Sequence, residues 1–194
     1  ADLGTYGNGI TVVGRYAYIT KEGIAGTCSS STQTGCEFVI YDISDPIRPT
    51  YVGGADTTNA GTGGTANFNK ISIQGKYAYT TVYSGASSGT CSSAVRDGCE
   101  IMIFDISNPT SPQFVGGADS TTGPGTDGVY ANAISGRYLY VGKINNGGTC
   151  SSADRTGCEF QILDVSNPQA PEYKSGIDEG SGDNRSIYVQ GKYA

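Results

Sequence analysis

The sequence predicts an all-β protein built from β-propeller-like blades, each with four antiparallel strands. One phrase recurs at residues 14–56, 75–119 and 136–178, and a partial fourth copy begins at Gly191. Each copy contains short strand-like runs that glycine, proline and Asx residues separate, which is typical of all-β repeats. No ten-residue stretch shows apolar side chains at helical spacing.

The first copy begins with two strands joined by one glycine. Residues 10–13 are a β-branched run, and residues 15–20 alternate aromatic with other side chains, as a half-buried strand does. Gly14 lies between them, where a tight turn favours a residue that tolerates positive φ. We therefore expect a hairpin here and at the equivalent Gly75 and Gly136.

Two further strands complete the unit. Residues 36–41 are apolar without alternation, which indicates a strand with both faces buried. The Asx-Pro sequence of residues 42–46 then predicts a turn, because the residue before proline avoids helical geometry and the carboxylate bonds nearby backbone. Residues 50–54 follow a second proline and suit a short edge strand.

The repeat divides the chain into units of similar length. The turn glycines Gly14, Gly75, Gly136 and Gly191 are 61, 61 and 55 residues apart. We expect a preceding loop at 1–9, blades at 10–56, 57–119 and 120–178, and the start of a fourth blade at 179–194 in a longer repeat protein. A β-solenoid would need much shorter turns, and an immunoglobulin-type array about seven strands per unit, so propeller blades fit best.

The recurring phrases resemble a known family. GKYAY, IFDISNP and VGGAD are similar to the LVIVD repeat, and DISDP at residues 42–46 matches its signature fully, with DISNP and DVSNP close to it. The resemblance implies a propeller in bacterial or archaeal surface or secreted proteins, and it brings no catalytic residues. The cysteine-bearing insertion between the second and third strands departs from the family pattern and leaves the role of that loop open.

The six cysteines indicate an oxidising compartment. They fall as Cys28/Cys36, Cys91/Cys99 and Cys150/Cys158, with seven residues inside each pair. A unit that recurs must be self-sufficient, so we expect a disulfide within each pair, worth about 2.6 kcal/mol in the chain-entropy model. Metal ligation is the alternative, but C-x2-C spacing and histidine are both absent. Disulfides favour an extracellular or cell-surface location.

Composition restricts the partners. The net charge is −6 and the pI about 4.5, which disfavours nucleic acid because an acidic surface repels phosphates. The sequence contains no apolar run approaching a membrane span. We expect further blades or copies of itself as partners, with a glycan or surface protein as another possibility.

Carboxylates and one asparagine are the candidate ligand and modification residues. Asp42, Asp105 and Asp164 recur at one position, where the interpretation is a turn-forming residue and the alternative a carboxylate lining an axis or binding cations. The glycine-rich loops offer oxygen ligands for calcium, although none has EF-hand spacing: Asp56, Asn59, Asp119, Asp127, Asp178, Glu179 and Asp183. No other cofactor is expected. Asn184-Arg185-Ser186 is an N-glycosylation triplet.

The tyrosines of the second strands are the last candidates. They could form a sugar-stacking ladder, but packing between blades is the more ordinary role: Tyr16, Tyr18, Tyr77, Tyr79, Tyr138, Tyr140 and Tyr193. Catalysis by a serine or cysteine nucleophile is disfavoured because no histidine exists to act as base.

The sequence therefore predicts a non-enzymatic structural or adhesive repeat protein, a surface scaffold or a building block of an extracellular filament. A module that presents its loops to glycans or a partner protein is the first alternative. A propeller enzyme whose active site lies outside these residues is the second.

Overall fold

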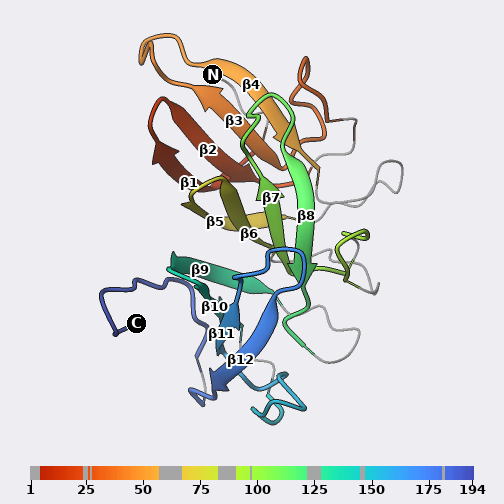
Figure 1. The fold of residues 1–194 in the computed structure, drawn as a ribbon, viewed down its shortest axis with the longest axis vertical. Coiled ribbons are helices and arrows are strands. Elements are labelled where there is room, and N and C mark those ends of the chain that lie inside the picture. The colour runs from red at the N-terminus through yellow and green to blue at the C-terminus, as the bar shows by residue number, and fades with distance from the viewer. Residues whose placement is uncertain are drawn as a thin grey trace.

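The chain folds into three sheets that follow one another along the long axis of the molecule (Figure 1). The structure, a computed structural model, describes residues 5–23, 26, 28–56, 67–82, 91–96, 98–121, 128–144, 147–180 and 182–194. These residues form strands, turns and bends, with no helix among them. The all-β, blade-like fold that the sequence predicts is confirmed.

Each sheet is one blade of four consecutive antiparallel strands. Blade 1 contains β1 (Gly7–Val13), β2 (Tyr16–Lys21), β3 (Phe38–Asp42) and β4 (Thr50–Ala55). Blade 2 contains β5 (Phe68–Gln74), β6 (Tyr77–Val82), β7 (Ile101–Asp105) and β8 (Gln113–Ala118). Blade 3 contains β9 (Val129–Ser135), β10 (Tyr138–Lys143), β11 (Phe160–Asp164) and β12 (Glu172–Ile177).

A glycine turn opens every blade as the sequence predicts. Gly14, Gly75 and Gly136 each have φ of 60°, and the flanking strands pair directly across the two-residue turn. Glycine at the first central position with positive φ is the signature of a type II′ hairpin. Gly191 has φ of 62° beside an isolated bridge between Gln190 and Tyr193, so the chain begins the same hairpin a fourth time.

The first strands of successive blades lie side by side. Thr11 Oγ1 donates to the Ile71 carbonyl at 2.9 Å, which links β1 to β5. Asn132 Nδ2 donates to the Lys70 carbonyl at 3.2 Å and links β9 to β5. The fourth strands lie at the opposite edge of each sheet.

Blades pack face to face, and we call each contact a joint. The forward face of a blade points to the next blade, and its rear face to the previous one. In the first joint, Phe38 on the forward face of blade 1 packs against Phe104 on the rear face of blade 2, with ring centroids 5.6 Å apart. In the second joint, Ile103 packs in one cluster with Leu163. The third strand of blade 2 is apolar on both sides because each side belongs to a different joint.

The two end faces differ. On the rear face of blade 1, Val39 and Tyr41 are buried in a cluster with Cys36. On the forward face of blade 3, Phe160 and Ile162 are only half-buried. A cleft of about 520 Å³ lies there, bounded on its other side by residues 184–194.

Candidate functional site

A disulfide closes one loop in each blade, between its second and third strands. Cys28 bonds Cys36, Cys91 bonds Cys99 and Cys150 bonds Cys158, with Cα separations of 4.6, 4.7 and 4.6 Å, and no cysteine is free. These pairs are the ones that the spacing predicts. We call residues 28–36, 91–99 and 150–158 the disulfide loops.

Each disulfide loop is seated on the fourth strand of its own blade. Gly54 faces the loop so closely that a Cβ there would lie 3.0 Å from the Cys36 sulfur, and at Gly176 a Cβ would lie 2.8 Å from the Cys158 sulfur. In blade 1 the Tyr51 hydroxyl also donates to the Ser29 carbonyl at 2.7 Å. The second glycine of the V-G-G phrase therefore makes room for the disulfide.

The loops of blades 2 and 3 also reach back to the preceding blade. Arg96 donates through Nη1 to the Asp56 carbonyl at 2.6 Å, and Arg155 donates through Nη2 to the Thr121 carbonyl at 2.9 Å. The two guanidinium groups lie 5.7 and 5.2 Å from the ring centroids of Phe114 and Tyr173 in their own blades. The disulfide loop thus connects two blades as well as two strands.

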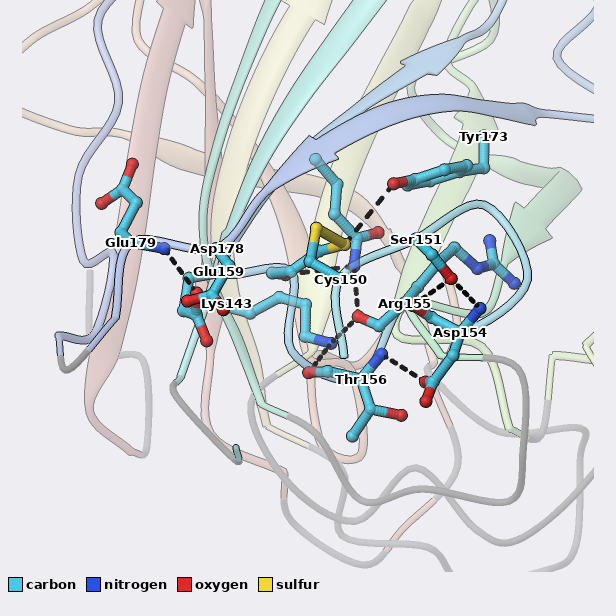
Figure 2. Close-up of a disulfide and its surroundings, with 12 residues drawn as sticks. Lys143, Cys150, Ser151, Asp154, Arg155, Thr156, Glu159, Tyr173, Asp178 and Glu179 are labelled. Atoms are coloured by element: carbon cyan, nitrogen blue, oxygen red, sulfur yellow. Dashed lines mark hydrogen bonds between the residues drawn. A yellow bond between two sulfur atoms is a disulfide. The ribbon is translucent and has the colours of Figure 1, made fainter. Parts of the chain in front are cut away.

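A buried lysine adds to this connection in blade 3. Figure 2 shows Lys143 extending to the disulfide loop, where its Nζ donates to the carbonyls of Arg155 and Thr156 at 3.3 and 3.4 Å. The same Nζ donates to the Ser120 carbonyl of blade 2 at 3.4 Å, and Gln161 Nε2 donates there at 2.8 Å. Carbonyl oxygens from two blades therefore accept hydrogen bonds from a fully buried lysine, as burial of a polar group requires.

The glutamate that follows the second cysteine is buried in every blade, and the sequence analysis missed it: Glu37, Glu100 and Glu159. Glu100 Oε2 accepts the Ser120 amide at 3.0 Å, and Glu159 Oε2 accepts the Glu179 amide at 2.9 Å (Figure 2). The carboxylate thus holds the start of the loop that leaves the fourth strand. The recurrence of Gly-Cys-Glu was the signal that could have identified this role.

The buried position of Glu100 also shifts its pKa far from the usual range. Burial, together with the negative charge of Asp119, raises its pKa to about 8. Ser120 opposes the shift by donating its amide. These surroundings favour the protonated form of Glu100.

Asp42, Asp105 and Asp164 form the turns that end the third strands. Asp42 Oδ1 accepts the Ser44 amide at 2.9 Å, and the same bond recurs at Asp105 and Asp164. Each carboxylate also pairs with the cation that follows the turn glycine: Arg15, Lys76 and Arg137. These contacts lower the pKa of Asp42 and of Asp105 to about 2. The geometry agrees with the turn-forming interpretation.

The second-strand tyrosines divide by their position in the stack. Tyr18 and Tyr79 are buried in the first and second joints. Tyr140, at the same position in blade 3, is half-buried beside the cleft, and Tyr193 is exposed. Tyr16, Tyr77 and Tyr138 each lie under the preceding cation, 5.2, 5.1 and 5.0 Å from it.

The calcium candidates are dispersed over the blades. Asp119 Oδ1 accepts the Thr121 amide, Asp178 Oδ1 accepts the Gly180 amide, and Asp183 pairs with Arg185. Asp56 offers its carbonyl to Arg96. Asp127 and Asn59 lie outside the described residues. In the part of the chain that the structure describes, no three His, Cys, Asp or Glu side chains come together as a metal site.

Asn184, the glycosylation candidate, lies against blade 3. Its backbone amide donates to the Lys143 carbonyl at 2.9 Å. Its side-chain Nδ2, the atom that would carry a glycan, is buried without a hydrogen-bond partner. Glycosylation at this position therefore requires modification before the segment packs.

Two observations bear on location. The three disulfides indicate a non-cytoplasmic compartment. None of the described residues belongs to a helix long and apolar enough to cross a membrane.

Comparisons with known proteins agree with this architecture. The family model for the LVIVD repeat matches residues 34–57, 94–120 and 153–178, which cover the third and fourth strands of each blade. No curated protein matches the chain. Among solved structures, the chain is similar to the crystal structure of the computationally designed Ika4 protein, with a TM-score of 0.53 and 10% identity over 96% of this chain and 81% of that chain. That likeness concerns the fold alone. The chain therefore contains three matches to the LVIVD repeat, one in each of its three blade-like sheets.

Proposed function

We propose that the chain is a non-enzymatic extracellular structural protein, a stack of disulfide-closed blades that serves as a surface scaffold or a building block of an extracellular filament. The observation that carries this proposal is that the recurring polar residues make structural contacts within a blade or between two blades. Asp105 forms a turn, Glu100 holds a loop, and Arg96 links two blades. A catalytic site would instead break the symmetry of the repeat.

The chemistry of the side chains supports a non-catalytic role. The chain has no histidine to act as a general base. All six cysteines are bonded, so none is a thiolate nucleophile. We expect no hydrolytic or redox turnover from the purified protein in a broad substrate screen.

The disulfides and the joints suit an extracellular scaffold. Each blade is closed by its own disulfide and fixed to its neighbour by an apolar joint. A linear stack of this kind gains stability from nearest-neighbour contacts, so each blade added to it contributes an interface as well as its own stability.

A binding module for glycans is the second candidate. Four aromatic side chains border the cleft on blade 3: Tyr140, Phe160, Tyr188 and Tyr193. Tyr188 and Tyr193 are 77% and 70% exposed, and exposed aromatic rings offer apolar faces on which sugars stack. A glycan array with the purified chain tests this candidate, and Tyr188→Ala should abolish any signal.

The scaffold role is tested on the cells that make the protein. Antibodies raised against the folded, oxidised chain should label surface layers or extracellular filaments in immunogold electron microscopy. Labelling confined to the cytoplasm, or a protein recovered only as a free solute in the medium, would contradict it.

A further inference from the structure

The two glycines of the V-G-G phrase have different neighbours. The second glycine faces the disulfide of its own blade, as at Gly54 and Gly176. The first faces the Asx-Pro turn of the next blade. A Cβ at Gly53 would lie 2.5 Å from the Pro109 carbonyl oxygen, and a Cβ at Gly116 would lie 2.2 Å from the Pro168 carbonyl oxygen.

These neighbours are backbone atoms on a turn that other contacts fix. The turn that holds Pro109 begins with Asn108, whose Oδ1 accepts the Thr110 amide at 3.2 Å. Asp105, just before it, is held by Ser107 and Lys76. A backbone carbonyl in such a turn cannot rotate away from an added methyl group. Any side chain at Gly53 therefore has to push the two blades apart.

Blade 3 lacks the first of these two glycines and keeps the second. Its fourth strand reads Lys174-Ser175-Gly176 where blades 1 and 2 read Val-Gly-Gly. The glycine beside its own disulfide is kept, and the glycine that would receive another blade is replaced. Lys174 and Ser175 are both exposed.

We propose that the first glycine of the V-G-G phrase determines which blades accept another blade, and that Ser175 excludes blade 3 from this joint. Gly53 and Gly116 act as sockets for the Asx-Pro turn that follows in the stack. Because Ser175 fills the equivalent socket, a blade that follows blade 3 must dock with its turn displaced from the outer strand.

The same contact between turn and glycine specifies which kind of blade could dock on blade 1. Blade 1 carries a turn of the docking type at Asp45-Pro46, and Ile47 beside it is 88% exposed. In blades 2 and 3 the equivalent turn sits on a glycine. The turn of blade 1 therefore fits a blade whose fourth strand carries glycine at the socket, and it does not fit blade 3 of a second copy of this chain.

A natural probe reports on the first joint. Met102 is the single methionine of the chain, it is 1% exposed, and it lies in the first joint with Phe38 and Ile40. Its oxidation by hydrogen peroxide, followed by mass spectrometry, measures how often that joint opens. Gly53→Ser places the residue of blade 3 in the first socket, so it tests directly whether serine is compatible with the joint.

Gly53→Ser should speed Met102 oxidation by about tenfold or more, because a joint held open exposes its buried side chains. Ser175→Gly should leave the oxidation rate unchanged. Gly116→Ser should also leave Met102 protected, while Tyr79, 3% exposed in the second joint, becomes reactive to hydroxyl radicals. This pair of variants separates a local joint defect from general unfolding.

Three results would overturn the proposal. The first is a Gly53→Ser protein that protects Met102 as the wild type does. The second is loss of the far-UV strand signal in both socket variants, since a joint-specific clash leaves the strand pairing within each blade intact. The third is self-association of the wild-type chain that Ile162→Lys abolishes, which would show blade 3 making the joint despite Ser175. None of these results bears on where the protein resides, so the scaffold role stands or fails separately.

Discussion

The forward faces of blades 2 and 3 carry equivalent residues in different surroundings. On blade 2, Ile101 and Ile103 are fully buried and Tyr79 is 3% exposed. On blade 3, Phe160, Ile162 and Tyr140 are only half-buried beside the cleft. The sheets that hold them are paired in the same way. The apolar pattern of a third strand is therefore completed by a neighbouring blade and not by its own sheet.

This difference predicts unequal stability along the stack. In a repeat protein, total stability is approximately the sum of the intrinsic stabilities of the units and the interfaces between neighbours. Blade 2 takes part in two joints, whereas blade 3 has one complete joint. Matched substitutions at equivalent positions can measure what each joint contributes.

The largest contrast is expected between Ile103→Ala and Ile162→Ala. Ile103 is fully buried in the second joint, so its truncation should lower the free energy of unfolding by about 2–5 kcal/mol. Ile162 is half-buried, and its truncation should cost less than about 2 kcal/mol. Chemical denaturation of both variants and the wild type measures the difference, and equal losses would mean that blade 3 is covered as completely as blade 2.

Removing one disulfide at a time compares the disulfide loops of blades 1 and 2. Replacing Cys28 and Cys36 by serine should cost about 2.6 kcal/mol of loop-closure entropy, because the hydrogen bond described for that loop stays within blade 1. Replacing Cys91 and Cys99 should cost more, because that loop also carries the Arg96 bond to blade 1. Unfolding midpoints of the two double variants give the order, and a larger loss in blade 1 would contradict the linking role of the loop.

Glu100 should make the folding stability of the protein depend on pH. Its pKa rises from about 4.5 to about 8 on folding, because burial and Asp119 disfavour its charge. When folding raises the pKa of a group, that group stabilises the folded state fully at pH values below its pKa in the unfolded chain. This stabilisation is lost as the pH rises through its pKa in the folded protein. Stability should therefore decline between about pH 4.5 and pH 8. Glu100→Gln should flatten this decline in thermal melts, and an unchanged slope would show that Glu100 does not cause it.

The smallest effect is expected from the exposed ion pairs that recur in every blade. Lys76 bonds Asp105 at 2.8 Å, but the lysine side chain is 56% exposed. Lys76→Met should cost less than about 1 kcal/mol, because solvent screens such pairs. A decrease in the free energy of unfolding as large as that of Ile103→Ala would mean that the turn, and not the joints, contributes most of the stability of the blade.

Sequence reasoning predicted most of the fold because the relevant signals are local. Gly14 requires a positive φ, residues 15–20 alternate, and Pro46 ends a strand, so each element is visible within a few residues. The start of β1 was missed: it begins at Gly7, three residues before the expected strand. Glycine is depleted in strands, and Gly9 is needed here because a Cβ would meet the Asn69 carbonyl of the next blade at 2.8 Å.

The candidate site was less predictable because its contacts cross between blades. Nothing local indicates that Arg96 reaches Asp56, or that Gly53 faces Pro109. The roles of Glu100 and Lys143 depend likewise on partners about twenty residues away or on the preceding blade. The repeat marked these residues as recurring, but only the packing of consecutive blades shows what each one contacts.

Three tyrosines at one repeat position test most directly the claim that a neighbouring blade buries the forward face of each blade. Tyr18 and Tyr79 lie inside complete joints, with exposures of 5% and 3%, while Tyr140 lies on the forward face of blade 3. Hydroxyl-radical footprinting of the native chain, read by mass spectrometry, reports the solvent access of each ring in one experiment. The joint architecture predicts protection of Tyr18 and Tyr79 and modification of Tyr140. Equal modification of the three tyrosines would contradict it.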